Sequence, residues 1–132
     1  MNPKWVLKAA VLSIHYEQIL EHGGVRGIRS LSLLESAIHR PQDKWFYRAN
    51  KRISLLDLGA AYCYSLTKNH PFFDGNKRTA LVTTFLFLRR NSIEIVATRQ
   101  DSFLLMVGIS ESKFTEQQIV HWLRERKSRK SP

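Results

Sequence analysis

The sequence predicts an all-α fold, a compact helical bundle around one central helix, on three observations. Apolar residues recur at spacings of three and four in several segments, as they do along amphipathic helices. Capping residues, glycines and a proline separate these segments. Residues 76–90 are apolar on all faces, which is typical of a helix in the centre of a domain. The 132 residues suffice for one core, so we expect a single domain over 1–132.

The first helix is expected to begin with Asn2 as N-cap and Pro3 at the first helical position, and to end before two consecutive glycines. Its apolar face comprises Trp5, Ala9, Leu12, Tyr16 and Ile19. The second helix is expected to start at Ser32, which has Glu35 at capping-box spacing. Pro41 is expected to end it, because the residue before a proline is disfavoured in the helical conformation.

Residues 40–54 have an irregular pattern that predicts a loop with one helical turn. Basic side chains surround three consecutive aromatic residues, and the members are Lys44, Arg48, Lys51 and Arg52 with Trp45, Phe46 and Tyr47. One interpretation is a docking segment for an anionic partner. The other is a solvated basic loop whose aromatic rings cover the core.

Four more helices complete the predicted bundle. Ser54 is the expected cap of a third helix that runs to about residue 69, and the fourth covers about 76–90. Residues 92–96 predict an extended connector. Thr98 and Thr115 then mark the starts of two further helices, each with a capping partner three residues later. The basic tail from about Arg124 is expected to fray.

Composition bounds the partners and the compartment. Lysine and arginine total 21 against 11 acidic residues, so the net charge of +10 favours anionic partners. The lone Cys63 excludes an internal disulfide framework and favours a reducing, cytoplasmic setting. No apolar run is long enough to span a bilayer, and the N-terminus is expected to belong to the mature fold. The chain lacks a Walker A or zinc pattern, and four histidines show no metal-ligand spacing: His15, His22, His39 and His121.

Residues 70–79, with the sequence HPFFDGNKRT, break the local rules for a helix start. Lys77 and Arg78 fall in the first turn of the fourth helix, where the helix dipole disfavours cations. A bound anion would reverse this effect, because both cations and the N–H groups after Gly75 would converge on it. Asp74 is a hard oxygen ligand suited to Mg²⁺, and His70 can take a proton near neutral pH. The segment therefore predicts a phosphate-transfer site.

A purely structural turn is the alternative interpretation of the same residues. In it Asp74 or Asn76 accepts hydrogen bonds from the helix N–H groups, and His70 packs beside Phe72.

Residues 70–80, HPFFDGNKRTA, resemble the signature of the Fic/Doc superfamily, and more closely its death-on-curing (Doc) branch, in which lysine follows the asparagine. The resemblance extends over most of the chain from about Ile14 to Asn91. It is carried there by Gly23-Gly24, Gly27–Arg29, Leu34–Ile38, Arg40–Gln42 and Phe87–Asn91. The resemblance implies a compact all-α bundle around a central helix that bears the motif.

The resemblance also implies transfer of part of a nucleotide, from ATP with Mg²⁺, to a protein hydroxyl. His70 would be the general base, Asp74 would hold the Mg²⁺, and Phe72 would anchor the loop in the core. The nucleotide phosphates would be bound by Gly75, Asn76, Lys77 and Arg78.

Two departures from the adenylylating Fic pattern favour the Doc branch. Lys77 replaces a glycine and Leu81 replaces an arginine that clamps phosphate, so ATP is expected to present its γ-phosphate. The Doc resemblance implies a Ser/Thr protein kinase of the toxin type, with a translation factor of the elongation factor Tu class as substrate. Adenylylation by the same site, favoured by Gly75, is the alternative. A basic nucleic-acid-binding module is a further alternative, although nucleic acid is not expected as the primary partner.

The resemblance implies a separate antitoxin as the second protein partner. Self-inhibited Fic proteins carry an [ST]-x-x-x-E-[GN] helix. Residues 13–18 and 112–117 have the serine and glutamate but end in glutamine, so neither matches.

Overall fold

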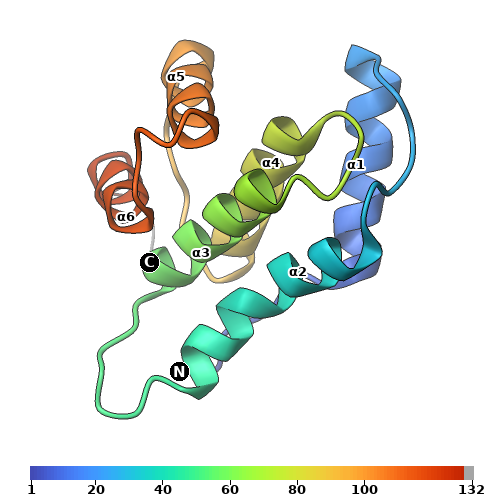
Figure 1. The fold of residues 1–132 in the computed structure, drawn as a ribbon. Coiled ribbons are helices and arrows are strands. Elements are labelled where there is room, and N and C mark those ends of the chain that lie inside the picture. The colour runs from blue at the N-terminus through green and yellow to red at the C-terminus, as the bar shows by residue number, and fades with distance from the viewer. Residues whose placement is uncertain (130–132) are drawn as a thin grey trace.

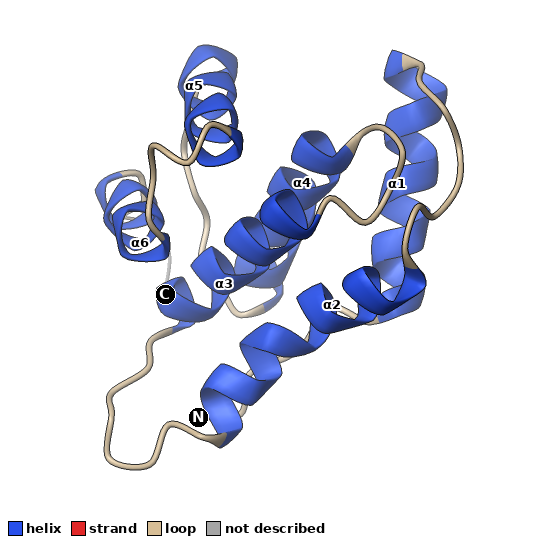
Figure 2. Cartoon of the chain, viewed as in Figure 1, coloured by secondary structure: helices blue, strands red, loops and turns tan. Residues whose placement is uncertain are grey.

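Residues 1–129, the part of the chain that the computed structural model describes, fold into six α-helices joined by loops (Figure 1). In chain order these are α1 (Lys8–His22), α2 (Leu31–Phe46), α3 (Leu55–Asn69), α4 (Asn76–Arg90), α5 (Arg99–Ser110) and α6 (Glu116–Glu125). Figure 2 shows no strand in this part of the chain, where extended pairing is confined to two isolated bridges. The predicted all-α class is confirmed.

Two helices occupy the interior of the bundle. The helix α3 packs against α2, α4, α5 and α6, and α4 packs against α1, α3 and α5. Gly59 of α3 lets α3 and α4 approach closely, because a Cβ atom there would lie 3.0 Å from Leu88 Cδ2. Tyr62 and Phe87 meet at this interface with ring centroids 5.0 Å apart. The helix that bears residues 76–90 is therefore central, as predicted, and α3 shares that position.

The prediction for the start of α1 is wrong. The helix begins at Lys8 rather than after Asn2, and its buried residues are Val11, Ile14, His15 and Ile19. Residues before Lys8 find tertiary partners in place of helical ones. The Val6 N–H donates to the Tyr62 hydroxyl at 3.0 Å, and the Lys4 N–H donates to Asn91 Oδ1 at 2.9 Å. These bonds hold the N-terminal segment against α3 and the end of α4.

Both predicted ends of the second helix are also wrong. Its N-cap is Ser30, whose hydroxyl accepts the Leu33 N–H, and the helix continues through Pro41 to Phe46. A proline inside a helix removes the N–H that would bond to the carbonyl four residues earlier, here that of Ala37. The hydroxyl of Ser65 on α3 lies 2.9 Å from that carbonyl oxygen and 2.7 Å from the Ala61 carbonyl oxygen. Its one hydrogen is shared between these two acceptors and so replaces part of the missing donor. Residues 40–46, expected in a loop, are therefore helical.

The helix caps that depend on local sequence agree with prediction. Ser54 forms a capping box with Asp57 at the start of α3. Thr98 accepts the Asp101 N–H at the start of α5, and Thr115 forms a capping box with Gln118 at the start of α6. None of the helices within residues 1–129 combines the length and the apolar character needed to cross a membrane.

The C-terminal segment pairs with the extended connector before α5. Ile95 and Lys127 form an antiparallel bridge, and the Val96 N–H donates to the Arg126 carbonyl at 2.8 Å. Because α6 extends to Glu125, residues 124–129 are held by helix and bridge, which differs from the predicted fraying. The rest of the predicted tail, 130–132, lies outside the described residues.

Candidate active site

The loop between α3 and α4 begins and ends with left-handed backbone. His70 is the C-cap of α3 with φ 49° and ψ 55°, and Gly75 is the N-cap of α4 with φ 76°. A Cβ atom at Gly75 would lie 3.3 Å from Ile19 Cδ1, so both the backbone and the packing favour glycine there. The carboxyl end of one central helix and the amino end of the other thus meet at the predicted motif.

Asn76 holds this loop together from inside. Its side chain is buried, its Oδ1 accepts the Phe72 N–H at 2.9 Å, and its Nδ2 donates to the Phe72 carbonyl at 2.9 Å. The same Nδ2 lies 2.8 Å from His70 Nδ1. The Phe72 N–H can only donate, so the Asn76 atom that it contacts is the acceptor Oδ1. The amide NH₂ group of Asn76 therefore faces His70. The side chain of Asn76 therefore orients the histidine ring, and only its backbone N–H remains for an anion.

His15 of α1 packs against the loop between α3 and α4. Its buried ring stacks on Phe72 with centroids 3.7 Å apart and ring planes 7° apart. Its Nε2 lies 2.9 Å from the Asp74 carbonyl oxygen, which can only accept, so Nε2 carries the hydrogen. Phe72 is itself 1% exposed and anchors the loop in the core, where the resemblance placed it. Sequence reasoning set His15 aside, because no local pattern connects it to a loop 59 residues away.

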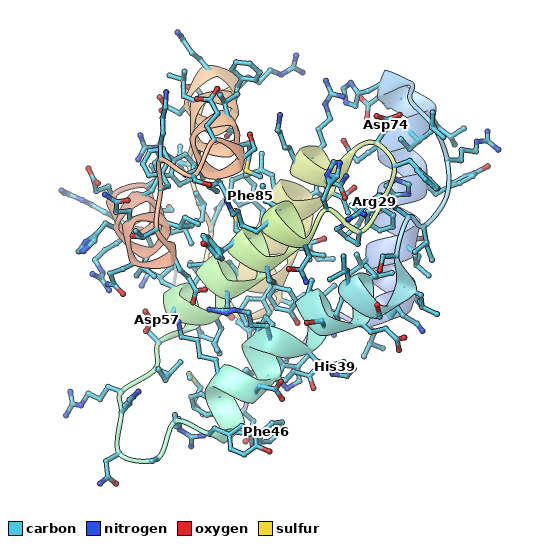
Figure 3. The ribbon with its side chains drawn as sticks, viewed as in Figure 1. Arg29, His39, Phe46, Asp57, Asp74 and Phe85 are labelled. Carbon is cyan, nitrogen blue, oxygen red and sulfur yellow. The ribbon has the colours of Figure 1, made fainter. Side chains whose placement is uncertain are left out.

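Asp74 presents its carboxylate at the surface beside the loop that follows α1. Its Oδ2 accepts the Val25 N–H at 2.6 Å. Gly24, with φ 119°, lies so close that a Cβ atom there would be 2.9 Å from Asp74 Cβ. Figure 3 shows Asp74 next to the loop that joins α3 to α4, close to α1. The turn at residues 23–25 therefore fixes the direction of this carboxylate.

Arg29 clamps the other end of the loop. Its Nε donates to the His70 carbonyl at 2.7 Å, and one terminal nitrogen donates to the Asn69 carbonyl at 3.0 Å. These carbonyls end α3, where a cation also complements the helix dipole. The Arg29 N–H donates to the Pro71 carbonyl at 2.7 Å, and Ile28 pairs with Phe72 in an antiparallel bridge. Sequence reasoning gave Arg29 no role.

The N-terminus of α4 has neither a side-chain cap nor an acidic residue in its first turn. Lys77 and Arg78 are both exposed there. The side chains of Asp74 and Asn76 bond to Val25, Phe72 and His70, and neither caps the α4 N–H groups. The contacts that the purely structural interpretation expects are therefore not the ones found, because neither residue caps the helix and because His15 stacks on Phe72.

The donor set fits a divalent ion held jointly with phosphate. No group of three or more His, Cys, Asp or Glu side chains within residues 1–129 could enclose a metal ion. Mg²⁺ binds through one or two carboxylates together with substrate phosphates and water, so an exposed Asp74 beside an uncapped helix N-terminus suits it.

The glutamate of the second partial inhibitory pattern serves a structural purpose. Glu116 forms ion pairs with Arg40 and Lys44 of α2, the latter at 2.6 Å, and so ties α6 to α2. The Glu116 carboxylate is therefore held by α2 and is not directed at the motif.

The comparisons with known proteins agree with the motif. Residues 5–88 match the model of the Fic/DOC family. Over 85 residues the chain is 33% identical to the protein kinase doc of Escherichia phage P1, a match that covers 64% of this chain and 66% of that protein. Over 75 residues it is 39% identical to the toxin Doc of Mycolicibacterium smegmatis, which covers 57% of each chain. The matches thus span less than two thirds of either relative. The matched region includes α1 to α3, the motif and α4 as far as Leu88, and this chain belongs to the Fic/DOC family and to its Doc branch.

Proposed function

We propose that this protein is a Doc-type toxin that transfers the γ-phosphate of ATP to a Ser or Thr hydroxyl of a translation factor of the elongation factor Tu class. The observation that carries the proposal is the uncapped N-terminus of α4, where Lys77 and Arg78 are exposed in the first turn. Cations at that end of a helix oppose the dipole unless an anion binds there. The relative from Escherichia phage P1 is named a protein kinase, which supports the reaction class.

In this proposal the phosphates lie against the α4 N-terminus. The backbone N–H groups from Gly75 and Asn76 onward donate to them, and the side chains of Lys77 and Arg78 neutralise their charge. Asp74 holds Mg²⁺, which supplies charge neutralisation on the phosphates. The substrate hydroxyl oxygen forms a bond to the γ-phosphorus, the bond to ADP breaks, and His70 takes the hydroxyl proton.

The contact with Asn76 determines how His70 acts as a base. A neutral imidazole whose Nδ1 accepts from Asn76 carries its hydrogen on Nε2. Taking a proton at Nε2 requires the other tautomer, with the hydrogen on Nδ1. If Nε2 takes the hydroxyl proton, the hydrogen bond between Asn76 Nδ2 and His70 Nδ1 must therefore break first.

Two side chains favour phosphate transfer over adenylylation. Leu81 is half-buried and offers no charge for a second phosphate clamp, and Lys77 stands exposed over the anion site. Gly75, which favoured adenylylation in the sequence, is accounted for by its positive φ and by the nearby Ile19 side chain. It does not discriminate between the two reactions.

The partners follow from the toxin assignment. A relative named toxin Doc supports a toxin–antitoxin pair in which a separate antitoxin inhibits this chain. The net charge of +10 suits an acidic antitoxin segment. We place the pair in the cytoplasm, where its proposed substrate works.

The test incubates purified protein and Mg²⁺ with a bacterial lysate in two tubes, one with ATP labelled at the γ-phosphate and one with ATP labelled at the α-phosphate. We expect a protein band to take up only the γ label. His70→Ala should abolish the labelling, and His121→Ala, which removes an exposed histidine of α6, should leave it unchanged. Uptake of the α label would establish adenylylation instead. If no protein band took up label in either tube, both reactions would be contradicted.

A further inference from the structure

Two basic segments that lie far apart in the sequence meet at one surface cavity. The cavity has a volume of about 540 Å³ and is lined by the loop after α2 and by Arg124 of α6. Its lining includes Trp45 at the end of α2 and Arg48, Lys51 and Arg52 of the loop. Residues 44–52 and the tail from Arg124 both stand out as basic in the sequence, and the fold brings parts of them together. We call these five residues the basic cavity.

The cations of the basic cavity are not neutralised within the described part of the chain. Lys51, Arg52 and Arg124 have no ion-pair partner among residues 1–129, whereas the neighbouring Lys44 is paired with Glu116. Asp57 also lines the cavity, but its Oδ2 accepts the N–H and the hydroxyl of Ser54 at 2.7 and 2.9 Å. The cavity therefore presents a net positive surface.

Aromatic rings accompany these cations. The guanidinium of Arg48 lies 3.6 Å from the centre of the Trp45 ring and donates to the Trp45 carbonyl, so it is held in place. Phe46 and Tyr47, which lie between Trp45 and Arg48 in the sequence, are 67% and 83% exposed. Figure 3 shows Phe46 at the end of α2 and Asp57 at the start of α3, on either side of the loop. Trp45 packs against the core, as the core-covering interpretation expects, whereas Phe46 and Tyr47 do not.

We propose that the basic cavity, with Phe46 and Tyr47, binds a single-stranded nucleic acid. Phosphates would lie against the four cations of the basic cavity, and unpaired bases would stack on the exposed rings. An acidic peptide would use the cations, but it does not carry a flat ring beside every charge, whereas each nucleotide supplies one phosphate and one base. A duplex offers phosphates while its base faces stay stacked and inaccessible.

This surface is separate from the candidate active site. The cavity lies at the start of α3 and His70 at its end, and a helix of 15 residues is about 22 Å long. Figure 1 places the loop before α3 and the loop after it at opposite ends of the molecule. The inference goes beyond the proposed phosphate transfer and does not depend on it.

The test measures fluorescence anisotropy of a labelled 15-nucleotide oligouridine titrated with the full chain at several salt concentrations. We expect the logarithm of the affinity to fall with the logarithm of salt with a slope of about −3, for four cations on a single strand. Lys51→Gln combined with Arg52→Gln should reduce this slope by about half. Arg99→Gln combined with Lys113→Gln removes the same charge at α5 and the turn after it, and should leave the slope unchanged.

Stacking is tested with Tyr47→Ala, an exposed side chain whose removal spares the core. We expect a loss of about five- to a hundredfold in affinity for oligouridine and no loss for an RNA duplex of equal length. His70→Ala should bind normally, which separates this result from the activity test. If the two double variants, at Lys51 with Arg52 and at Arg99 with Lys113, reduced the salt slope equally, the proposal would be overturned. Binding would then follow net charge alone. Competition by polyglutamate but not by oligouridine would replace it with an acidic protein partner.

Discussion

The imidazole of His15 lies flat on the ring of Phe72, and the same imidazole donates a hydrogen bond to the Asp74 carbonyl. One buried side chain of α1 thus holds two residues of the motif loop, the anchor and the proposed metal ligand. This contact makes α1 part of the site, although no residue of α1 is proposed to touch substrate.

We expect His15→Ala to lower kcat for phosphate transfer at least about tenfold, because a displacement of about 1 Å in a reacting group costs up to about a hundredfold. It should also lower the free energy of unfolding by about 1 to 3 kcal/mol, from the lost hydrogen bond and the cavity. The control is His22→Ala, an exposed histidine on the same helix. If folded His15→Ala protein kept full kcat, the residue would stabilise the fold without positioning the site.

Gly24→Ala should weaken the apparent affinity of the site for Mg²⁺, which raises the Mg²⁺ concentration needed for half-maximal rate. The added Cβ atom would lie 2.9 Å from Asp74 Cβ and would displace that carboxylate. Gly23→Ala is the matched control, because Gly23 also has a positive φ, at 81°, but no atom lies within 4 Å of its Cβ position. Both changes place a side chain at a positive φ, which costs about 1 to 3 kcal/mol, and only Gly24→Ala adds the contact with Asp74. Equal Mg²⁺ titrations for the two variants would contradict the role of Asp74.

The proline inside α2 predicts coupling between Pro41 and Ser65. In the natural chain Ser65→Ala should cost about 1 to 2 kcal/mol of unfolding free energy, because the buried Ala37 carbonyl loses its donor. In a Pro41→Ala background the restored N–H can bond to that carbonyl, and the cost should be smaller by about 1 kcal/mol. Urea denaturation of the four proteins measures the difference. Additive costs would show that the hydroxyl does not replace the missing N–H.

Stability should decrease in alkali because of two buried neighbours on α3. Burial raises the pKa of the Cys63 thiol from 9.0 to about 12 and that of Tyr62 from 10.0 to about 12. Between about pH 9 and 12 the unfolded chain loses protons that the folded chain retains, so the free energy of unfolding falls as pH rises. Cys63→Ala with Tyr62→Phe should flatten this fall in denaturation curves.

The same burial makes the thiol unreactive. At pH 8 the folded protein should not react with a thiol reagent, and denaturant should release one reactive thiol per chain, because Cys63 is the single cysteine. Rapid reaction under native conditions would contradict the buried position.

Helix caps and other features that depend on residues close in the chain can be predicted from the sequence. Ser54, Thr98 and Thr115 cap helices because each finds its partner within three residues, and the motif's cations at a helix start are visible without a fold. Where a tertiary partner replaces a local bond, the sequence misleads. Pro41 does not end α2, since Ser65 of another helix satisfies the freed carbonyl. Asn2 does not start α1, since the segment after it bonds to Tyr62 and Asn91.

The residues that surround the motif become apparent from the packing of the helices. His15 and Arg29 reach the loop from 59 and 41 positions away, and Arg124 joins a loop more than 70 residues earlier. The physical reason is that a helix presents residues at local spacing, whereas contacts between helices depend on packing that no single segment specifies. The chemistry of residues 70–79 is therefore apparent in the sequence, and the contacts that hold these residues in position arise from the fold.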